Sequence, residues 1–452
     1  MRKIVVAATS LIAVSPLQAE TLTTFEAAPG QEFLTLGEYK PAFPGATALN
    51  LDVGIGSALF RDPAAAENTY YTVSDRGPNF TCGDLEGLMP VKKDEACPEV
   101  ADLKAGDGRL YPLPDYNVSI YQVSLDPAAK TFTVTNAIPL KTPAGKPITG
   151  LTNPLTIAKT DKPRDGAGQP IPQDINAIDA EGLVKLADGR FFIGEENATG
   201  IVEVSPEGVV VRRFVPAGTE GDFASADYPV SGSIPAIYAK RTSNRGIESL
   251  SVSDDGAHLY ALVQNPLANP DSKAYGNAIN ARLLKLEIGT DGEATTLTPV
   301  AEYVYQLDDW NRFAALGATD AEKPSSLRIS EMTALGHEHF LVDERTDQVA
   351  KLFEISLEGA TNILGTPWDD EATSPSLEQT EDLAAAGVTP VSKTERLVAS
   401  SLEGAATRYP GKIEGASLTA DGNLVLINDN DFGIAGAPTQ ILVIEGTEIG
   451  PH

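Results

Sequence analysis

Cysteine, histidine and long apolar stretches are scarce in this chain of 452 residues. Two cysteines and four histidines give no cluster typical of a zinc site. The sequence also has no Gly-x-Ser-x-Gly elbow, phosphate-binding loop or dinucleotide fingerprint, and no convincing nucleophile triad. His337 and His339 flank Glu338 like a metal pair, but they fall in an expected hairpin turn, where we interpret them as structural. If the protein is an enzyme, this composition favours a metal-activated water as the nucleophile.

Positive charge is also scarce. The chain has 34 lysines and arginines against 63 aspartates and glutamates, which gives a formal net charge of −29. This balance excludes binding to nucleic acid or to an anionic membrane surface through bulk charge, whereas cations would be concentrated near the protein. We therefore expect no nucleic-acid partner, no membrane insertion and a monomeric protein.

The longest apolar run stands at the N-terminus. Arg2 and Lys3 precede it, and small or neutral residues up to Ala19 offer a cleavage site. This pattern is typical of a secretory signal peptide over residues 1–19, and a buried strand or helix is the alternative. The run is shorter than the roughly 20 residues that cross a bilayer. We predict a mature chain that begins near Glu20 and is periplasmic or secreted.

The two cysteines, Cys82 and Cys97, lie in one polar loop within residues 80–100. In an oxidising compartment such a pair typically forms a disulfide, so we predict a disulfide-pinned loop at this place. Two free thiols are the alternative.

The fold is indicated by a repeat. No long segment keeps a period of 3.6 residues, and no Pro/Gly/Ser linker divides the chain into unlike halves. Instead, a glutamate opens a strand, a turn follows, and a second strand ends in polar or acidic residues. Four copies open at Glu181, Glu248, Glu331 and Glu414, and a looser copy opens at Gly54. Two further strands usually follow each copy, and four strands per repeat predict an all-β fold, a β-propeller.

We expect residues 20–452 to form one propeller domain of five blades, with six also possible. The last copy has a single strand after its hairpin before the chain ends. A strand from the N-terminus, near residues 33–36, is expected to complete that blade and close the ring. A pair of β-sandwiches is the alternative fold, but it would not predict a glutamate at the start of each repeat.

The repeat also predicts where charge gathers. In a propeller the start of the first strand and the end of the second strand lie side by side on one rim. Many carboxylates in one place raise each other's pKa or require a cation, and oxygen ligands without thiolate or imidazole suit Ca²⁺. Hydrogen bonding of each glutamate to backbone amides of the next blade is the alternative. The predicted metal ligands are Glu181, Glu195, Glu196, Glu248, Glu331, Asp343, Glu414 and Asp429.

Basic residues stand beside these acids on the same rim. Arginine matches phosphate or carboxylate oxygens in two-point contacts, so we expect these arginines to steady an anionic substrate. An acid nearby would take the proton from water. Ion pairing with the neighbouring acids is the alternative for the arginines. The predicted catalytic residues are Asp75, Arg76, Arg245, Glu344 and Arg345.

Two motifs connect the chain to a known family. The runs Ser74-Asp75-Arg76-Gly77-Pro78-Asn79 and Asp179-Ala180-Glu181-Gly182-Leu183 resemble the phytase-like propellers, the family called "esterase-like activity of phytase". The resemblance spans nearly all of the mature chain. It implies a propeller with a calcium-dependent phosphoester hydrolase or esterase role. Gly54 and Asn265 depart from the acidic pattern, which reduces the number of anionic ligands and argues against a multi-calcium centre like that of true propeller phytases.

These observations lead to one main hypothesis and two alternatives. The main hypothesis is an exported calcium-dependent hydrolase that acts on a small phosphoester or related anionic ester at the carboxylate-rich rim. The first alternative is a periplasmic propeller that binds a ligand or cation without catalysis. The second is a lactonase-like propeller, which also uses a metal at the mouth of its channel.

Overall fold

The computed structural model describes residues 20–31, 34–41, 46–89, 92, 108–447 and 449–450. The predicted signal peptide lies outside the described residues, and so does Cys97 of the predicted disulfide. Cys82 is buried at the start of helix α1 (Cys82–Leu88), which is capped by Thr81, whose hydroxyl accepts a hydrogen bond from the backbone N–H of Asp84. The export signal and the disulfide therefore stay predictions.

The described residues form an all-β fold, as predicted, with few helices. Strands are short apolar runs that begin and end at turns. For example, the Asp188-Gly189 turn, with Gly189 at a positive φ of 94°, leads into the buried strand Phe191–Glu195. In the described part of the chain, no helix is long and apolar enough to cross a membrane. The helices after α1 are η2 (Glu220–Phe223), η3 (Ala236–Lys240), α4 (Ser272–Asn277), α5 (Trp310–Ala315), η4 (Pro324–Ser326), η5 (Pro367–Asp369), η6 (Leu377–Gln379) and η7 (Asp431–Gly433).

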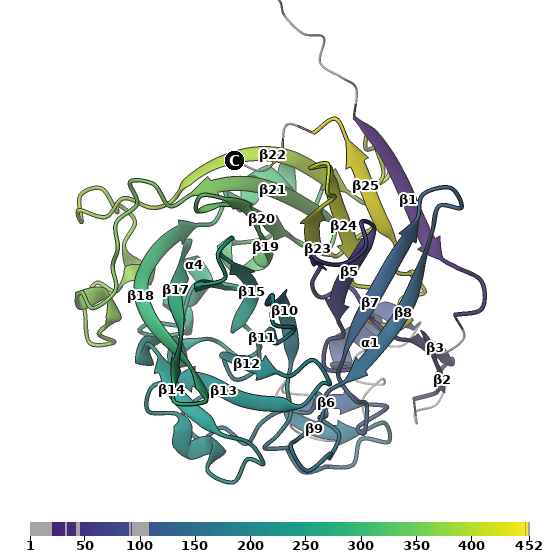
Figure 1. The fold of residues 1–452 in the computed structure, drawn as a ribbon, viewed down its shortest axis with the longest axis horizontal. Coiled ribbons are helices and arrows are strands. Elements are labelled where there is room, and N and C mark those ends of the chain that lie inside the picture. Colours follow the sequence, from purple (N-terminus) through teal and green to yellow (C-terminus); the bar gives the residue numbers. More distant parts are fainter. Residues whose placement is uncertain are drawn as a thin grey trace, which may run out of the picture.

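Three sheets share one order, in which each strand pairs antiparallel with the next along the chain, and β14 joins the first sheet in parallel. Figure 1 shows the sheets arranged around a central axis, with β10, β15 and β19 innermost. Their strands are β10 (Ala180–Lys185), β11 (Phe191–Glu195), β12 (Gly200–Val204), β13 (Val210–Pro216) and β14 (Val230–Ile234); β15 (Ile247–Val252), β16 (His258–Val263), β17 (Asn280–Asp291) and β18 (Ala294–Gln306); and β19 (Arg328–Gly336), β20 (His339–Arg345), β21 (Val349–Ser356) and β22 (Ser392–Ser400).

A fourth sheet joins the two ends of the chain. Its order is β23-β24-β25-β1-β8-β7-β5-β4. The strands are β23 (Ile413–Leu418), β24 (Leu424–Asn428), β25 (Ile441–Glu445), β1 (Thr21–Ala27), β8 (Thr131–Pro139), β7 (Ser119–Asp126), β5 (Thr69–Val73) and β4 (Phe60–Arg61). Two smaller ladders stand apart, β2 (Thr35–Tyr39) with β3 (Leu49–Asp52) and β6 (Gly108–Tyr111) with β9 (Lys162–Asp165).

The N-terminus does join the last sheet, but through a different segment from the predicted one. Strand β1 pairs antiparallel with β25 from Thr21 to Phe25 and touches β8 only at Glu26 and Ala27. Of the predicted segment at residues 33–36, the part from Thr35 onward lies in β2 and pairs with β3. The looser first copy also differs from the prediction, because residues 54–59 form no strand and β4 pairs with β5 in their place.

The inner strands approach each other closely near the axis. A Cβ atom added to Gly182 would lie 2.7 Å from the carbonyl oxygen of Glu248 on the neighbouring sheet. At Gly415, an added Cβ would lie 2.8 Å from the carbonyl carbon of Ala58. Only glycine permits such close backbone-to-backbone packing at these two positions.

We predict that closure through β1 contributes strongly to stability. Phe25 is 3% exposed and packs with Ile441 and Val425, so Phe25→Ala removes a buried ring and leaves a cavity. The expected loss of unfolding free energy is about 3–5 kcal/mol, measured by urea denaturation. Thr21→Ala, an exposed position in the same strand, should change it by less than about 0.5 kcal/mol. An equal loss in both variants would contradict a stabilising role for the buried side of β1.

Candidate functional site

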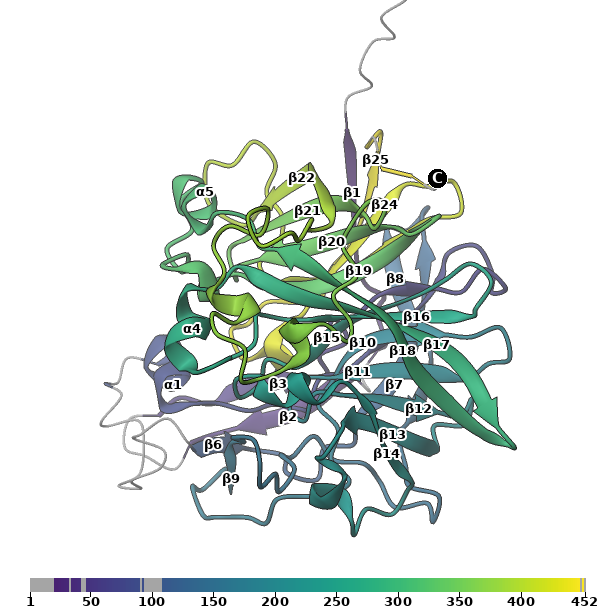
Figure 2. The same ribbon diagram turned by 90° about the vertical axis from the view of Figure 1, so that its left-hand side faces the viewer.

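A cavity of about 710 Å³ opens at the end of the axis where the inner strands begin. Glu181, Glu248 and Glu414, each the second residue of its inner strand, line this cavity. Residues of α1 line it as well, and Figure 2 shows α1, α4 and α5 at the same end of the sheets. We call this space the acid cavity.

A bulge near the start of each inner strand brings these glutamates to the cavity. The pairing register shifts between Ala180 and Leu183 in β10, and again at the corresponding place in each of the other inner strands. A bulged residue lies outside the ladder and can be re-aimed toward the axis. The bulges contain Glu181 with Gly182, then Glu248, Ser330 and Glu414.

The residues at the ends of the second strands form another set around the same cavity. Asp75 follows β5, Glu196 follows β11, Gln264 follows β16, and Asp429 follows β24, while Arg345 is the last residue of β20. All five line the acid cavity. The ends of the second strands therefore lie together on one rim, as predicted, although Gln264 and Arg345, which are not acids, stand at two of its positions.

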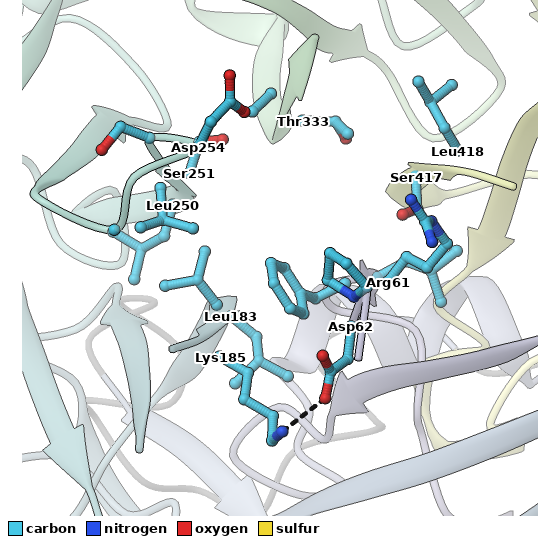
Figure 3. A pocket seen from close by; sticks show the side chains of 18 of the residues that line it. Arg61, Asp62, Leu183, Lys185, Leu250, Ser251, Asp254, Thr333, Ser417 and Leu418 are labelled. Atoms are coloured by element: carbon cyan, nitrogen blue, oxygen red, sulfur yellow. Dashed lines mark hydrogen bonds and ion pairs between the residues drawn. The ribbon is translucent and has the colours of Figure 1, made fainter. Parts of the chain in front are cut away.

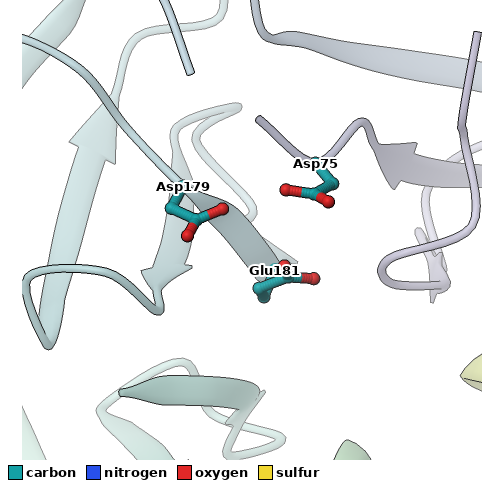
Figure 4. A group of neighbouring side chains, drawn as sticks. All are labelled: Asp75, Asp179 and Glu181. Carbon is teal, nitrogen blue, oxygen red and sulfur yellow. The ribbon is translucent and has the colours of Figure 1, made fainter. Parts of the chain in front are cut away.

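Carboxylates are densest beside β10. One oxygen each of Asp75, Asp179 and Glu181 lie within 4.8 Å of one another, and the same holds for Glu181, Glu196 and Glu248. Figure 4 shows Asp75, from the segment after β5, facing Asp179 and Glu181 at the start of β10. Glu181 belongs to both groups, so the five residues form one cluster, which we call the acid cluster.

Burial is the main influence on the protonation of this cluster. Burial, reinforced by the charges of Glu248 and Asp75, raises the pKa of Glu181 well above its usual value. Burial likewise raises the pKa of Glu196 to about 7, although Arg245 and Arg76 oppose the rise. The pKa of Asp179 rises to about 6 through burial, against the charge of Arg76. Burial therefore favours the protonated form of these carboxyl groups, and a bound cation would compete with those protons.

Asp179 was not among the residues selected from the sequence. It is 1% exposed, and neither of its carboxylate oxygens accepts a hydrogen bond from an N–H or alcohol donor in the described part of the chain. Arg76 is its ion-pair partner, at 3.3 Å. The Asp-x-Glu spacing of Asp179 and Glu181 was the available signal, because the bulge brings both residues to one side of β10.

Two arginines border the acid cluster. The guanidinium of Arg76 is buried and also lies 3.8 Å from Asp161 and 4.0 Å from Asp75. Arg245 pairs with Glu196 at 3.2 Å. Both predicted arginines therefore lie in the acid cavity beside carboxylates.

The other side of the cavity is already neutralised. Arg345 donates from Nε to Ser330 Oγ at 2.9 Å and pairs with Asp347 at 3.1 Å and with Glu414. Lys412 pairs with Asp429 at 2.9 Å and also contacts Glu414. In the described part of the chain, Glu181 and Glu248 of the acid cluster have no such ion pair.

Two predicted site residues point away from the cavity because side chains alternate along a strand. Glu195 is fully buried, pairs with Arg213 at 3.6 Å, and accepts hydrogen bonds from the N–H groups of Ala198 and Asp179. Glu344 lies between sheets, where it contacts Lys393 and Tyr305. Neither residue lines the acid cavity.

Asp343 and Glu331, which are paired across β19 and β20, also lie outside the acid cavity. Asp343 is fully buried, and burial raises its pKa well above the usual value. Glu331 follows the bulged residue instead of occupying the bulge. Its carboxylate accepts hydrogen bonds from the backbone N–H groups of Leu59, at 3.0 Å, and Met332, at 2.9 Å. This geometry matches the backbone-binding alternative.

The histidines of the hairpin turns lie elsewhere. His258, His337 and His339 line a separate cavity of about 300 Å³ together with Glu338. Glu338 itself binds Lys285, at 2.5 Å, and Tyr260, at 3.0 Å. This cavity shares no residue with the acid cavity, in agreement with the structural interpretation of these histidines.

The contacts of Glu331 predict a structural role. In Glu331→Gln one acceptor oxygen becomes an NH₂ donor, so a buried backbone N–H loses its partner. We expect a loss of about 1–3 kcal/mol in unfolding free energy, measured by urea denaturation. Calcium affinity, measured by calorimetry on the same variant, should be unchanged. A calcium affinity that falls tenfold would place Glu331 among the metal ligands.

The raised pKa of Glu196 predicts a pH dependence of stability. Its folded pKa of about 7 exceeds the usual 4.5, so the folded protein binds this proton more tightly than the unfolded chain does. Stability from this group is complete below pH 4.5 and is lost as pH rises through 7. Between pH 4.5 and pH values above 7, with chelator present, the unfolding free energy of wild type should therefore fall by on the order of 3 kcal/mol relative to that of Glu196→Gln. The magnitude follows because a shift of one pKa unit corresponds to about 1.4 kcal/mol. Thermal unfolding across pH measures the difference, and parallel curves would contradict it.

Comparison with known proteins connects this geometry to a family. An "Uncharacterized secreted protein" of Arthroderma benhamiae is 28% identical over 143 residues, or 29% of this chain and 27% of that protein. The PQQ-bound aldose sugar dehydrogenase of Streptomyces coelicolor aligns over 95% of this chain and 99% of its own, with 11% identity and a TM-score of 0.32. Virginiamycin B lyase of Staphylococcus aureus aligns over 94% and 99%, with 10% identity and a TM-score of 0.28. The model of the phytase-like family, described as "Esterase-like activity of phytase", matches residues 52–432, and the chain belongs to this family.

Proposed function

We propose that this chain is an exported, calcium-dependent hydrolase of small phosphoesters or related anionic esters, and that the acid cavity of a five-bladed propeller is its active site. The observation that carries the proposal is the acid cluster, in which two overlapping groups of three carboxylates lie beside two arginines, and four of its five members line the acid cavity. Perturbed carboxylates in a cleft are characteristic of functional sites.

The acid cluster fits a hard divalent cation. Its donors are all carboxylate oxygens, the ligand type that Ca²⁺ prefers. Oδ2 of Asp179 is paired with Arg76, whereas Oδ1 accepts no hydrogen bond from an N–H or alcohol donor among the described residues and is available as a ligand. Asp75, Asp179, Glu181, Glu196 and Glu248 would hold the ion. A bound Ca²⁺ polarises a phosphoryl or carbonyl oxygen and makes a water more acidic.

The residues around the cluster have separate roles in this proposal. Arg76 and Arg245 bind the anionic oxygens of the ester and stabilise the charge that develops on them. Asp75 is the most exposed member of the cluster, with 23% of its side chain accessible, and it takes the proton of the attacking water. Arg345 neutralises Glu414 on the opposite side of the cavity, where it also contacts Asp347 and Ser330. Glu344 has no role in catalysis, because its carboxylate is bound to Lys393 and Tyr305 outside the cavity.

Three observations support the blade number and the export. The three repeated sheets, together with β23–β25 plus β1, and β4, β5, β7 and β8, make five groups of strands around the axis. The N-terminal sequence has the pattern of a signal peptide. The fungal relative is a secreted protein by its name.

A second candidate function is cation binding without catalysis. It is favoured by the ion pairs of the cavity, because Arg345 and Lys412 are already engaged by acids and offer little to a substrate anion. In that case the acid cluster would bind its ion and no reaction would follow. In the lactonase-like alternative, the same ion would be bound, and the substrate would be a neutral cyclic ester.

The test compares two matched substitutions. Hydrolysis of p-nitrophenyl phosphate, its bis-phosphodiester, p-nitrophenyl acetate, phytate and a lactone is measured with Ca²⁺ and with chelator. Glu181→Gln removes the carboxylate shared by both halves of the cluster and should lower kcat/KM at least tenfold, with weaker calcium binding. Glu293→Gln, in the exposed turn between β17 and β18, should leave both unchanged.

The outcomes separate the candidates. Calcium-dependent turnover of a phosphoester or aryl ester that Glu181→Gln abolishes supports the hydrolase. Calcium binding without turnover of any substrate overturns it in favour of cation binding. Turnover of the lactone alone would indicate the lactonase-like activity. Activity that persists in chelator would show that the reaction does not need the ion.

A further inference from the structure

A second cavity, of about 590 Å³, lies at the opposite end of the axis, where the inner strands end. It shares no residue with the acid cavity in the described part of the chain. Figure 3 shows side chains from β4, β10, β15, β19 and β23 around this second cavity, which we call the distal cavity.

The inner wall of the distal cavity is largely apolar. Leu59, Leu183, Leu250, Met332 and Leu418 come from five separate segments and surround the axis. Glu331 is the first β19 residue of the lining, and backbone amides bind its carboxylate. A ligand that enters this space therefore meets these apolar side chains, together with the hydroxyl groups of Ser251, Thr333 and Ser417.

The mouth of the distal cavity carries charge and hydroxyl groups. Lys185 and Asp62 form an ion pair of 2.5 Å at one edge, so their charges cancel. Arg61 also lines the mouth, and in the described part of the chain its guanidinium has neither a hydrogen bond nor an ion pair. Figure 3 places Arg61 on the same side as Ser417. The mouth thus contains one cation whose five N–H donors are available.

Ligand sites are typically cavities of roughly 300–1,000 Å³ with apolar walls and a few placed polar groups. An unpaired guanidinium at such a mouth matches a carboxylate in a two-point contact. We propose that the distal cavity binds a small carboxylic acid with an apolar tail. The carboxylate pairs with Arg61 at the mouth, and the tail lies among the leucines. Asp254 and Asp255, which also line the mouth, repel the carboxylate toward Arg61.

The proposal is independent of the hydrolase, and calorimetry on the full mature chain with Ca²⁺ tests it. The probes are octanoate, octanol and acetate, which separate the charge from the tail. Octanoate should bind at one site per chain, at least tenfold more tightly than octanol or acetate. Arg61→Gln should weaken octanoate binding at least tenfold and leave octanol binding unchanged. Because Arg61 lies partly exposed in the two-residue strand β4, the variant should unfold at the wild-type temperature.

Two further variants locate the site. Arg408→Gln replaces an exposed arginine away from both cavities and should bind octanoate like wild type. Glu181→Gln should also bind it like wild type, since it changes only the acid cavity. The proposal is overturned if wild type does not bind octanoate, if Arg61→Gln binds it as tightly as wild type, or if Glu181→Gln abolishes binding, which would place the acid in the other cavity.

Discussion

The cost of ionising several carboxyl groups that are buried together in the acid cluster is the constraint on which the rest of the structure depends. Several carboxylates lie together out of water, and burial alone disfavours the charge of each one. The arginines beside them offset part of this cost. The apolar layers between sheets, such as the layer that contains Phe192, Leu262 and Leu284, hold the inner strands in place and offset the rest of this cost.

The bulge in each inner strand converts this constraint into a site. The register shifts at Glu248 in β15 and at Glu414 in β23. Without this extra residue, the regular alternation of side chains would continue, and the residues on one side of the bulge would lie on the opposite face of the strand. In β19 the bulge contains Ser330, whose hydroxyl lies 3.4 Å from Glu248 and accepts a hydrogen bond from Arg345. The ring of acids is therefore interrupted at this sheet, where the guanidinium of Arg345 lies in place of a carboxylate.

The sequence indicated the all-β fold, the family and the crowding of acids on one rim, because strand periodicity and repeated glutamates are local signals. It could not separate Glu331 from Glu248, since the two positions differ by one residue of register that only pairing with the second strand defines. Nor could it show that Glu344 is bound to Lys393, 49 residues away, or that Arg345 is engaged by Glu414. The predicted closing strand, near residues 33–36, lies too far along the sequence. Segments 21–27 and 35–39 both have strand character, but only the first pairs with the edge of β25.

The pairing of β1 with β25 also determines the order in which the molecule can be completed. Strand β1 is made before every other described strand, and its partner β25 is made after all of them. Until residues 441–445 emerge, one edge of β1 has no antiparallel partner, and the last sheet lacks its outer strand. The contact between β1 and β25 joins segments far apart in the sequence, and such contacts are slow to form. The last sheet therefore closes only after residues 441–445 have been made, and their removal would leave an exposed sheet edge.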